Sequence, residues 1–179
     1  MALTKINNNT LSAVTTLPSA IATGKVLQIV STTKTDTFSM TSSTTWTDVT
    51  GLTLNITPSS SSNKILLVAT INGMGTASQT RVSFKFMRDS TAIGIGDAAG
   101  SRARTGFAKL YEASGRSLSG TSGNFLDSPS SASQVVYKIQ AYADSGSPVY
   151  VNRSQTYTDD NTYETTVSTI TAMEIAGWL

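Results

Sequence analysis

Hydrophobic and polar residues alternate with a period of two along much of the chain, and this pattern is typical of half-buried β-strands. The clearest case lies in the segment 81–104, where Val82, Phe84 and Phe86 would share one face of a strand. A short polar run then predicts a turn, and 92–96 predicts the return strand. We therefore expect a β-hairpin here. Two strands alone bury too little to be stable, so other strands must cover its apolar face.

Further strands are predicted wherever an alternating or continuous apolar segment is bounded by turn residues. These segments are 25–31, 38–40, 46–49, 52–56, 65–71, 104–111, 135–143, 149–151 and 166–175. The segment 65–71 is apolar on both faces and is expected at the centre of a sheet. Gly51 is expected to turn the chain between two strands. The Gly/Ser-rich segment 112–133 is expected to be loop, mobile at 117–122 and anchored at 125–129.

Eight to ten short strands without a convincing helix predict an all-β fold, an antiparallel β-sandwich that is jelly-roll-like. Residues 24–179 are expected to form one domain, because this length can bury a core of its own. Residues 1–23 are expected to form an extended N-terminal arm with scattered apolar residues. Those residues are Leu3, Ile6, Leu11, Val14, Leu17 and Ile21. Two interpretations of the arm stay open: a frayed terminus, or an anchoring segment that docks on a neighbouring subunit.

The composition narrows the possible partners. Charged residues make up 13% of the chain and the net charge is +2, so we expect no binding to nucleic acid. No apolar run approaches the roughly 18 residues of a membrane span, so we expect no membrane insertion. A chain poor in charge, rich in Thr and Ser and without Cys fits a component of an extracellular particle. It fits other β proteins as well.

The sequence contains neither His nor Cys, which excludes Ser-His-Asp and Cys-His catalysis and ordinary zinc sites. We therefore expect no enzymatic activity, no catalytic residue, no cofactor and no metal. The glycines at 94, 96 and 100 are spaced one residue too widely for a dinucleotide fingerprint. Two alternatives for the acidic residues are a glycosidase carboxylate pair and a hard-cation site at 159–161, but ordinary turn chemistry is favoured. The carboxylates considered are Asp97, Asp127, Asp159, Asp160 and Glu164.

Three arginines stand near strand ends, where they can fasten loops. Arg102, Arg104 and Arg153 are expected to pair with Asp97 or Asp127 at a subunit interface. The alternative is that all five are solvated surface charges, and the sequence does not decide between the two.

Several runs of this chain resemble virion structural proteins of tailed bacteriophages from marine and freshwater habitats (cyanophage-like), in particular tail-fibre-like proteins. Together they cover most of residues 24–176, and the opening MALTKI is similar to openings of such proteins. The runs are GKVLQ (24–28), VTGL (49–52) with TP (57–58), MRDSTAIGIGDAAGSR (87–102), FLDSP (125–129), YVNRS (150–154) and STITAMEI (168–175).

The resemblance implies a β-sandwich module of the virion, assembled as a homotrimer and lying on the extracellular particle. We expect a tail-fibre or fibre-like protein that is anchored by its arm to other virion proteins. Its loops at 112–123 and 157–163 would contact a host-surface glycan or protein, with Tyr111, Tyr157 and Tyr163 stacking on sugars. The alternative is a capsid decoration (cement or head-fibre) protein. We expect the protein to differ from long fibres, because the sequence shows only a short arm and no shaft ahead of the module.

Overall fold

The computed structural model of the protein describes residues 25–40, 44–73, 75–76, 81–109, 118–143 and 148–176, and these residues contain strands and loops without a helix. The strands are β1 (Val26–Lys34), β2 (Phe38–Met40), β3 (Thr47–Ile56), β4 (Lys64–Ile71), β5 (Gly75–Thr76), β6 (Val82–Arg88), β7 (Thr91–Ile93), β8 (Phe107–Lys109), β9 (Thr121–Asp127), β10 (Val135–Ala143), β11 (Val149–Val151) and β12 (Ser168–Ile175). Accordingly, the described part of the chain holds no helix that could cross a membrane. The predicted all-β class is confirmed.

The strands pair in a nested order. β1 pairs with β12, β2 with β11, β3 with β10, β4 with β9 and β6 with β8, all antiparallel. Nested antiparallel pairs form one long double strand, and further pairing of β12 with β4 and of β10 with β6 rolls it up. Successive long pairs then fall in alternate sheets, which is the arrangement of a jelly roll. The predicted antiparallel, jelly-roll-like sandwich is therefore confirmed.

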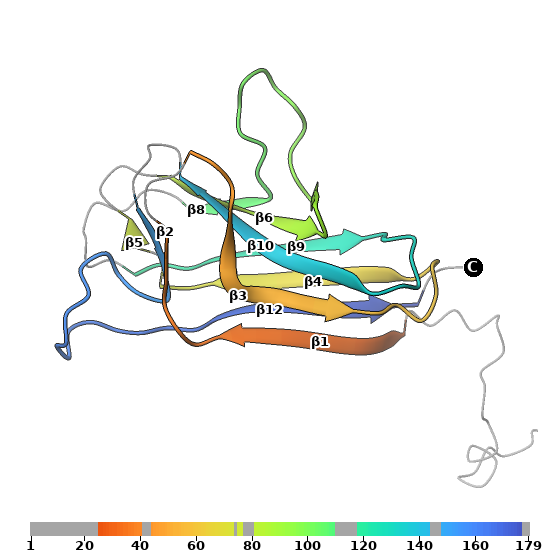
Figure 1. Ribbon diagram of the computed structural model, residues 1–179, viewed down its shortest axis with the longest axis horizontal. Coiled ribbons are helices and arrows are strands. Elements are labelled where there is room, and N and C mark those ends of the chain that lie inside the picture. The colour runs from red at the N-terminus through yellow and green to blue at the C-terminus, as the bar shows by residue number, and fades with distance from the viewer. Residues whose placement is uncertain are drawn as a thin grey trace, which may run out of the picture.

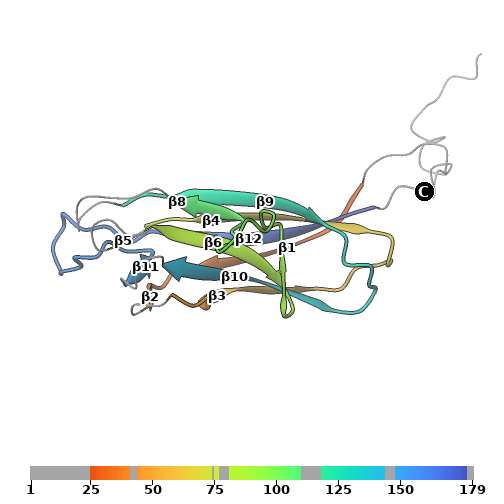
Figure 2. The same ribbon diagram turned by 90° about the horizontal axis from the view of Figure 1, so that it is seen from above.

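Two sheets form the layers of the sandwich (Figures 1 and 2). One is four-stranded with the order β1-β12-β4-β9, and the other has the order β3-β10-β6-β7 with β8 also paired to β6. A small sheet of β2, β11 and β5 lies at one end. We call this end the loop end, because the long connection between β11 and β12 also lies there (Figure 1). We call the opposite end the terminal end; it holds Val26 and Ile175, the outer bounds of β1 and β12.

The core lies between the two sheets, where each strand contributes every second residue. Phe84 and Phe86 are fully or nearly fully buried, as the period of two predicts. The ring of Phe107 lies 5.6 Å from that of Phe84 and 5.4 Å from that of Phe86, measured between centroids. Leu67 and Ile170 complete the opposite side of the core from the four-stranded sheet.

One prediction about the loops is wrong. The segment 112–133 does not remain loop throughout its described part, because Thr121–Asp127 forms β9 at the edge of the four-stranded sheet. Gly123 faces inward there, and a side chain at this position would collide with the ring of Phe107. The strand therefore needs a glycine to admit a core aromatic ring, and this packing overrides the low strand propensity of Gly and Ser.

Three strand boundaries also differ from the prediction. Gly51 does not end a strand; it adopts a φ of 88° inside the continuous strand β3. The return strand of the hairpin stops at Ile93, since Gly94 turns the chain with a φ of 59°. The strand predicted from 104 begins at Phe107, because the preceding residues belong to a projecting loop.

Candidate binding surface at the loop end

A buried asparagine organises the loop end of the sandwich. Asn152 follows β11, is fully buried and has a φ of 63°. Its Nδ2 donates to the carbonyl oxygens of Lys34 and Asp36, both at 2.9 Å. Its Oδ1 accepts a hydrogen bond from Ser168 Oγ at 2.7 Å. One amide thus ties the end of β1, the end of β11 and the start of β12 together. Asparagine suits this position because it tolerates the left-handed conformation.

The loop from 152 to 166 is fixed at its start against Asn72 and Gly73, and its end is bonded back to its start. The backbone N–H of Asn152 donates to the Asn72 carbonyl at 3.0 Å, and that of Arg153 donates to the Gly73 carbonyl at 2.8 Å. At the other end the Thr166 N–H donates to the Asn152 carbonyl at 3.2 Å. Gly73 has a φ of 56°, and an added Cβ would lie 2.9 Å from the Asn152 backbone. This close approach requires a glycine.

Arg153 holds an exposed tyrosine of this loop. Its guanidinium carbon lies 4.5 Å from the ring centroid of Tyr150 and 4.7 Å from that of Tyr157. The guanidinium also donates to the carbonyl oxygens of Ser154 at 3.1 Å and Gln155 at 3.0 Å. These contacts fix the Tyr157 ring through a cation–π interaction. Tyr157 is nevertheless 42% exposed. A fixed, half-exposed aromatic ring is suited to binding a flat apolar surface.

A hollow of about 260 Å³ opens beside this tyrosine. It is lined by Tyr157, Thr158, Asp159, Asp160, Tyr163 and Thr165. The loop keeps its shape through local hydrogen bonds: Asp160 Oδ1 accepts from Thr162 N at 2.8 Å, and the Asp160 carbonyl accepts from Tyr163 N at 3.1 Å. The hollow therefore combines two aromatic rings with carboxylates and hydroxyl groups.

A second groove of about 520 Å³ lies next to this hollow and shares Thr165 with it. It is lined by Asn72–Gly73, 118–120 and 165–167. Within the described residues, the hydroxyl groups of Ser119 and Thr166 are buried there without a hydrogen-bond partner. Buried hydroxyls that lack partners can donate to or accept from a polar ligand at little desolvation cost. The loop end thus presents two adjacent hollows.

The five residues predicted for loop fastening lie at three different places in the structure. Asp97, Arg102 and Arg104 lie together in the exposed loop that projects between β7 and β8 (Figure 1). There Arg104 Nε donates to the Gly96 carbonyl at 2.6 Å and Arg102 Nη1 donates to the Ala99 carbonyl at 3.1 Å. Arg153 lies at the loop end, and Asp127 lies at the terminal end. A role at a subunit interface stays a prediction.

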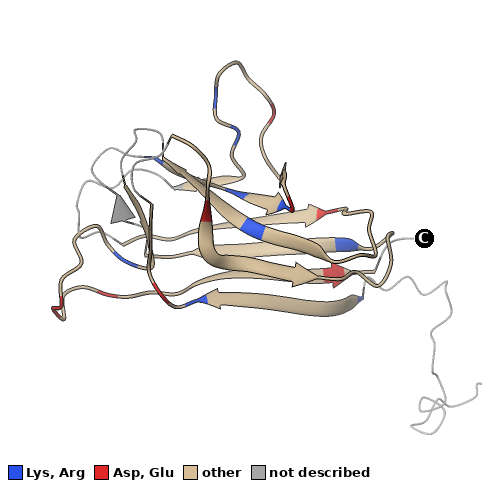
Figure 3. Ribbon diagram, in the orientation of Figure 1, with Lys and Arg blue, Asp and Glu red and all other residues tan. Residues whose placement is uncertain are grey.

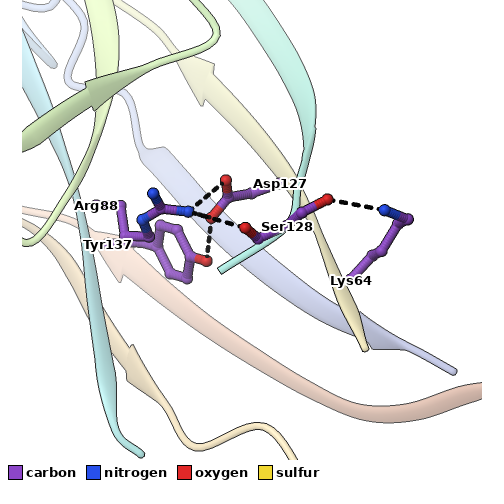
Figure 4. A network of polar contacts seen from close by, with 5 residues as sticks. All are labelled: Lys64, Arg88, Asp127, Ser128 and Tyr137. Carbon is purple, nitrogen blue, oxygen red and sulfur yellow. Dashed lines mark hydrogen bonds and ion pairs between the residues drawn. The ribbon is translucent and has the colours of Figure 1, made fainter. Parts of the chain in front are cut away.

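Asp127 joins the two sheets at the terminal end (Figure 4). It is 4% exposed at the end of β9, and its carboxylate accepts both bonds from Arg88 Nη1, at 2.9 and 3.0 Å. The Tyr137 hydroxyl donates to the same carboxylate at 2.6 Å. Burial and this contact raise the pKa of Tyr137, so its hydroxyl stays protonated and remains a donor. Lys64 extends the network by donating to Ser128 Oγ at 2.8 Å.

A second buried carboxylate, Glu174, was missed by sequence reasoning. It is fully buried, and it accepts hydrogen bonds from Gln28 Nε2 at 2.5 Å, Asn63 Nδ2 at 2.5 Å, and the backbone N–H and hydroxyl of Ser59, both at 2.7 Å. Burial raises the pKa of Glu174, but these hydrogen bonds outweigh it and hold the pKa below its ordinary value. Its inward register beside Ile170 and Ala172 is the signal that could have revealed it.

The described residues contain no group of three or more Asp, Glu, His or Cys side chains that could hold a metal ion. Of the carboxylates weighed as a glycosidase pair, Asp159 and Asp160 share the hollow at the loop end, whereas Asp127 is engaged at the terminal end. Six predicted arm residues and one tyrosine fall outside the described residues. They are Leu3, Ile6, Leu11, Val14, Leu17, Ile21 and Tyr111.

Comparisons with known proteins do not identify a family for this chain. No protein-family model and no curated protein matches the chain. Ten chains of solved structures match its fold. One of them belongs to the structure of infectious bursal disease virus Gx strain, at 14% sequence identity and a TM-score of 0.35. The match covers 83% of this chain and 38% of the viral chain, so this chain spans well under half of that protein. At these values the match carries no information about function.

Proposed function

We propose that this protein is a non-enzymatic structural protein of a bacteriophage virion, a homotrimeric tail-fibre or fibre-like component that contacts the host surface through its loop end. The observation that carries the proposal is the loop end itself. A rigid jelly roll, held by the buried Asn152, presents a fixed and exposed Tyr157 beside two adjacent hollows. The resemblance of the sequence to virion proteins of tailed phages supports the same assignment.

The chemistry of the loop end favours a glycan as the contacted group. Sugars bind to aromatic rings through their C–H faces and to carboxylates and hydroxyls through their own hydroxyl groups. Tyr157 and Tyr163 supply rings, Asp159 supplies a carboxylate, and Ser119 and Thr166 supply buried hydroxyls nearby. Tyr111 remains part of the proposal on sequence grounds. Residues 1–23 would anchor the protein to other virion proteins.

The location is tested by immunogold electron microscopy of phage particles with an antibody against this chain. Gold on the tail or its fibres is the expected result. An even distribution over the capsid would instead assign the protein to capsid decoration, and particles without gold would contradict the virion assignment.

The host contact is tested separately, by adding purified protein to host cells and measuring how far it blocks phage adsorption. We expect Tyr157→Ala to weaken this block about five- to tenfold, because a stacked aromatic contributes on the order of 1–1.5 kcal/mol. Tyr142→Ala is the matched control, since Tyr142 is a half-buried tyrosine whose ring lies 5.3 Å from that of Trp46 and which lines neither hollow. Equal blocking by the two variants would contradict the assignment of the loop end.

A further inference from the structure

The outer face of the four-stranded sheet carries an apolar row that crosses all four strands. The strand registers place Ile29 opposite Met173, Met173 opposite Leu66, and Leu66 opposite Leu126. All four point away from the core, because their neighbours along each strand are the more buried residues. Ile29 at one edge of the sheet is 61% exposed, and Leu126 at the other edge is 49% exposed.

The row continues toward the terminal end of the sheet. Val26 and Leu27 are 51% and 45% exposed there, and Ile175 is paired with Val26 across the strands. Single exposed apolar residues are ordinary, whereas a contiguous group on a flat face marks an interaction surface.

This face is also nearly free of charge. Its four strands contain four charged residues near their ends (Figure 3), and three of these, Lys34, Asp127 and Glu174, are buried within the chain. Lys64 alone lies on the outer face, at its end, and its Nζ donates to Ser128. A partner that brought charges against the face would leave them buried without a counter-charge, which is costly. The partner surface must therefore be uncharged as well.

We infer that this outer face packs against further copies of the same chain, with the β1 edge of one copy against the β9 edge of the next. The inference rests on the proposed homotrimer and names the surface that would form it. Neighbours around a threefold axis make a heterologous contact, so each copy must offer two different patches. Ile29 and Leu126 meet this need, because they stand at opposite edges of the sheet in the same row, at one level along the strands, and a threefold axis along the strands would bring them together. A second copy also brings an equally uncharged face.

Because the natural chain contains no cysteine, crosslinking can test this contact directly. The test variant is the full-length double variant Ile29→Cys/Leu126→Cys, oxidised after purification and resolved on denaturing gels. The two positions lie three strand spacings apart within one chain, roughly 14 Å, which is too far for an internal disulfide. We expect covalent dimers and trimers in at least about ten times the yield of the control Val136→Cys/Leu126→Cys, because Val136 lies on the outer face of the other sheet. Sedimentation of the unmodified protein should show the same assembly without crosslinks.

Three outcomes would overturn the inference: a monomer in sedimentation at about 100 μM, crosslinks no more abundant than in the control, or crosslinking of the single variant Ile29→Cys. The single-variant result would indicate a twofold contact between equal edges. The purified protein suffices for all of these, so their failure is distinguishable from that of the virion assignment, which depends on particles. Gold labelling of the tail together with an uncrosslinked protein would reject this surface and leave the proposed function standing.

Discussion

The two polar clusters that close the ends of the sandwich use different chemistry. At the terminal end, Asp127 and Glu174 are buried carboxylates that accept three and four hydrogen bonds. At the loop end, Asn152 is a buried amide that both donates and accepts. A carboxylate can gather several donors, but its contribution depends on its ionisation. A neutral amide serves both roles at any ordinary pH. The hydrogen bonds of Asn152, which support the candidate binding surface, therefore do not depend on a change of protonation.

Removing Asp127 is expected to have the largest effect on stability. Asp127→Ala leaves Arg88 and the Tyr137 hydroxyl without their shared acceptor, and breaking a largely buried pair costs about 3–5 kcal/mol in the free energy of unfolding. Urea denaturation of purified protein measures this loss. Tyr137→Phe is the control, expected to cost about 2 kcal/mol, since it removes one hydrogen bond and leaves the ion pair intact. A loss below about 1 kcal/mol in Asp127→Ala would mean that the ion pair contributes little.

Asn152→Ala is expected to reduce the free energy of unfolding by about 2–4 kcal/mol, because three hydrogen bonds of its side chain are lost and alanine disfavours a positive φ. Asn152→Gly separates the two causes: it loses the same bonds but accepts the backbone conformation, so it should be less destabilising by about 1 kcal/mol. Thermal and urea unfolding of both variants measure the difference. If both variants matched the unmodified protein, the amide would not be holding the loop end.

Glu174 is expected to make stability depend on pH. Since its pKa is lower in the folded than in the unfolded chain, its contribution is present above the unfolded pKa and is lost as the pH falls through the folded pKa. Glu174→Gln should cost about 1–2 kcal/mol at neutral pH, where one acceptor becomes a donor. The variant should then lose less stability than the unmodified protein between about pH 5 and pH 3. Equal acid sensitivity of the two proteins would place the titrating group elsewhere.

The smallest effect is expected on the outer face of the other sheet. Lys138 Nζ lies 2.6 Å from Asp48 Oδ2 at a half-exposed position. Surface ion pairs contribute about 0–1 kcal/mol because solvent screens them. Lys138→Met should therefore change the free energy of unfolding by less than about 1 kcal/mol, and the remaining effect should shrink further in 1 M salt. A change as large as that of Asp127→Ala would show that this exposed ion pair contributes as much to stability as the buried one.

Local alternation was enough to predict most of the strands, because the side chains of a strand face its two sides in turn regardless of what covers them. It predicted the buried Phe84 and Phe86 and the class of the fold. It failed at Thr121–Asp127, where the strand depends on Gly123 admitting the Phe107 ring from another part of the chain. Such contacts between distant segments leave no local signal.

The candidate site likewise contains residues that the sequence could identify and residues that it could not. The tyrosines at 157 and 163 could be selected by residue type, and the hollow does bring them together with Asp159. The residues that hold the site in place, Asn152 and Arg153, could not be found in this way. Asn152 acts through Lys34, Asp36 and Ser168, which are far away in the sequence. Arg153 acts through Tyr150 and Tyr157, which come close to it only because of the conformation of the loop. Partners of this kind become visible only once the strands are paired.

The nested pairing of the strands has a consequence for how the chain is made. Val26 pairs with Ile175, so β1 has no partner until β12 has left the ribosome. At about 5–20 residues per second, synthesis of the intervening segment takes roughly 7–30 s. The hairpin of β6 with β7 can form first, the pair of β6 with β8 follows, and each outer pair must wait longer. β4 lacks its β12 neighbour until β12 has been synthesised, so a chain truncated before β12 would be prone to aggregate through β4.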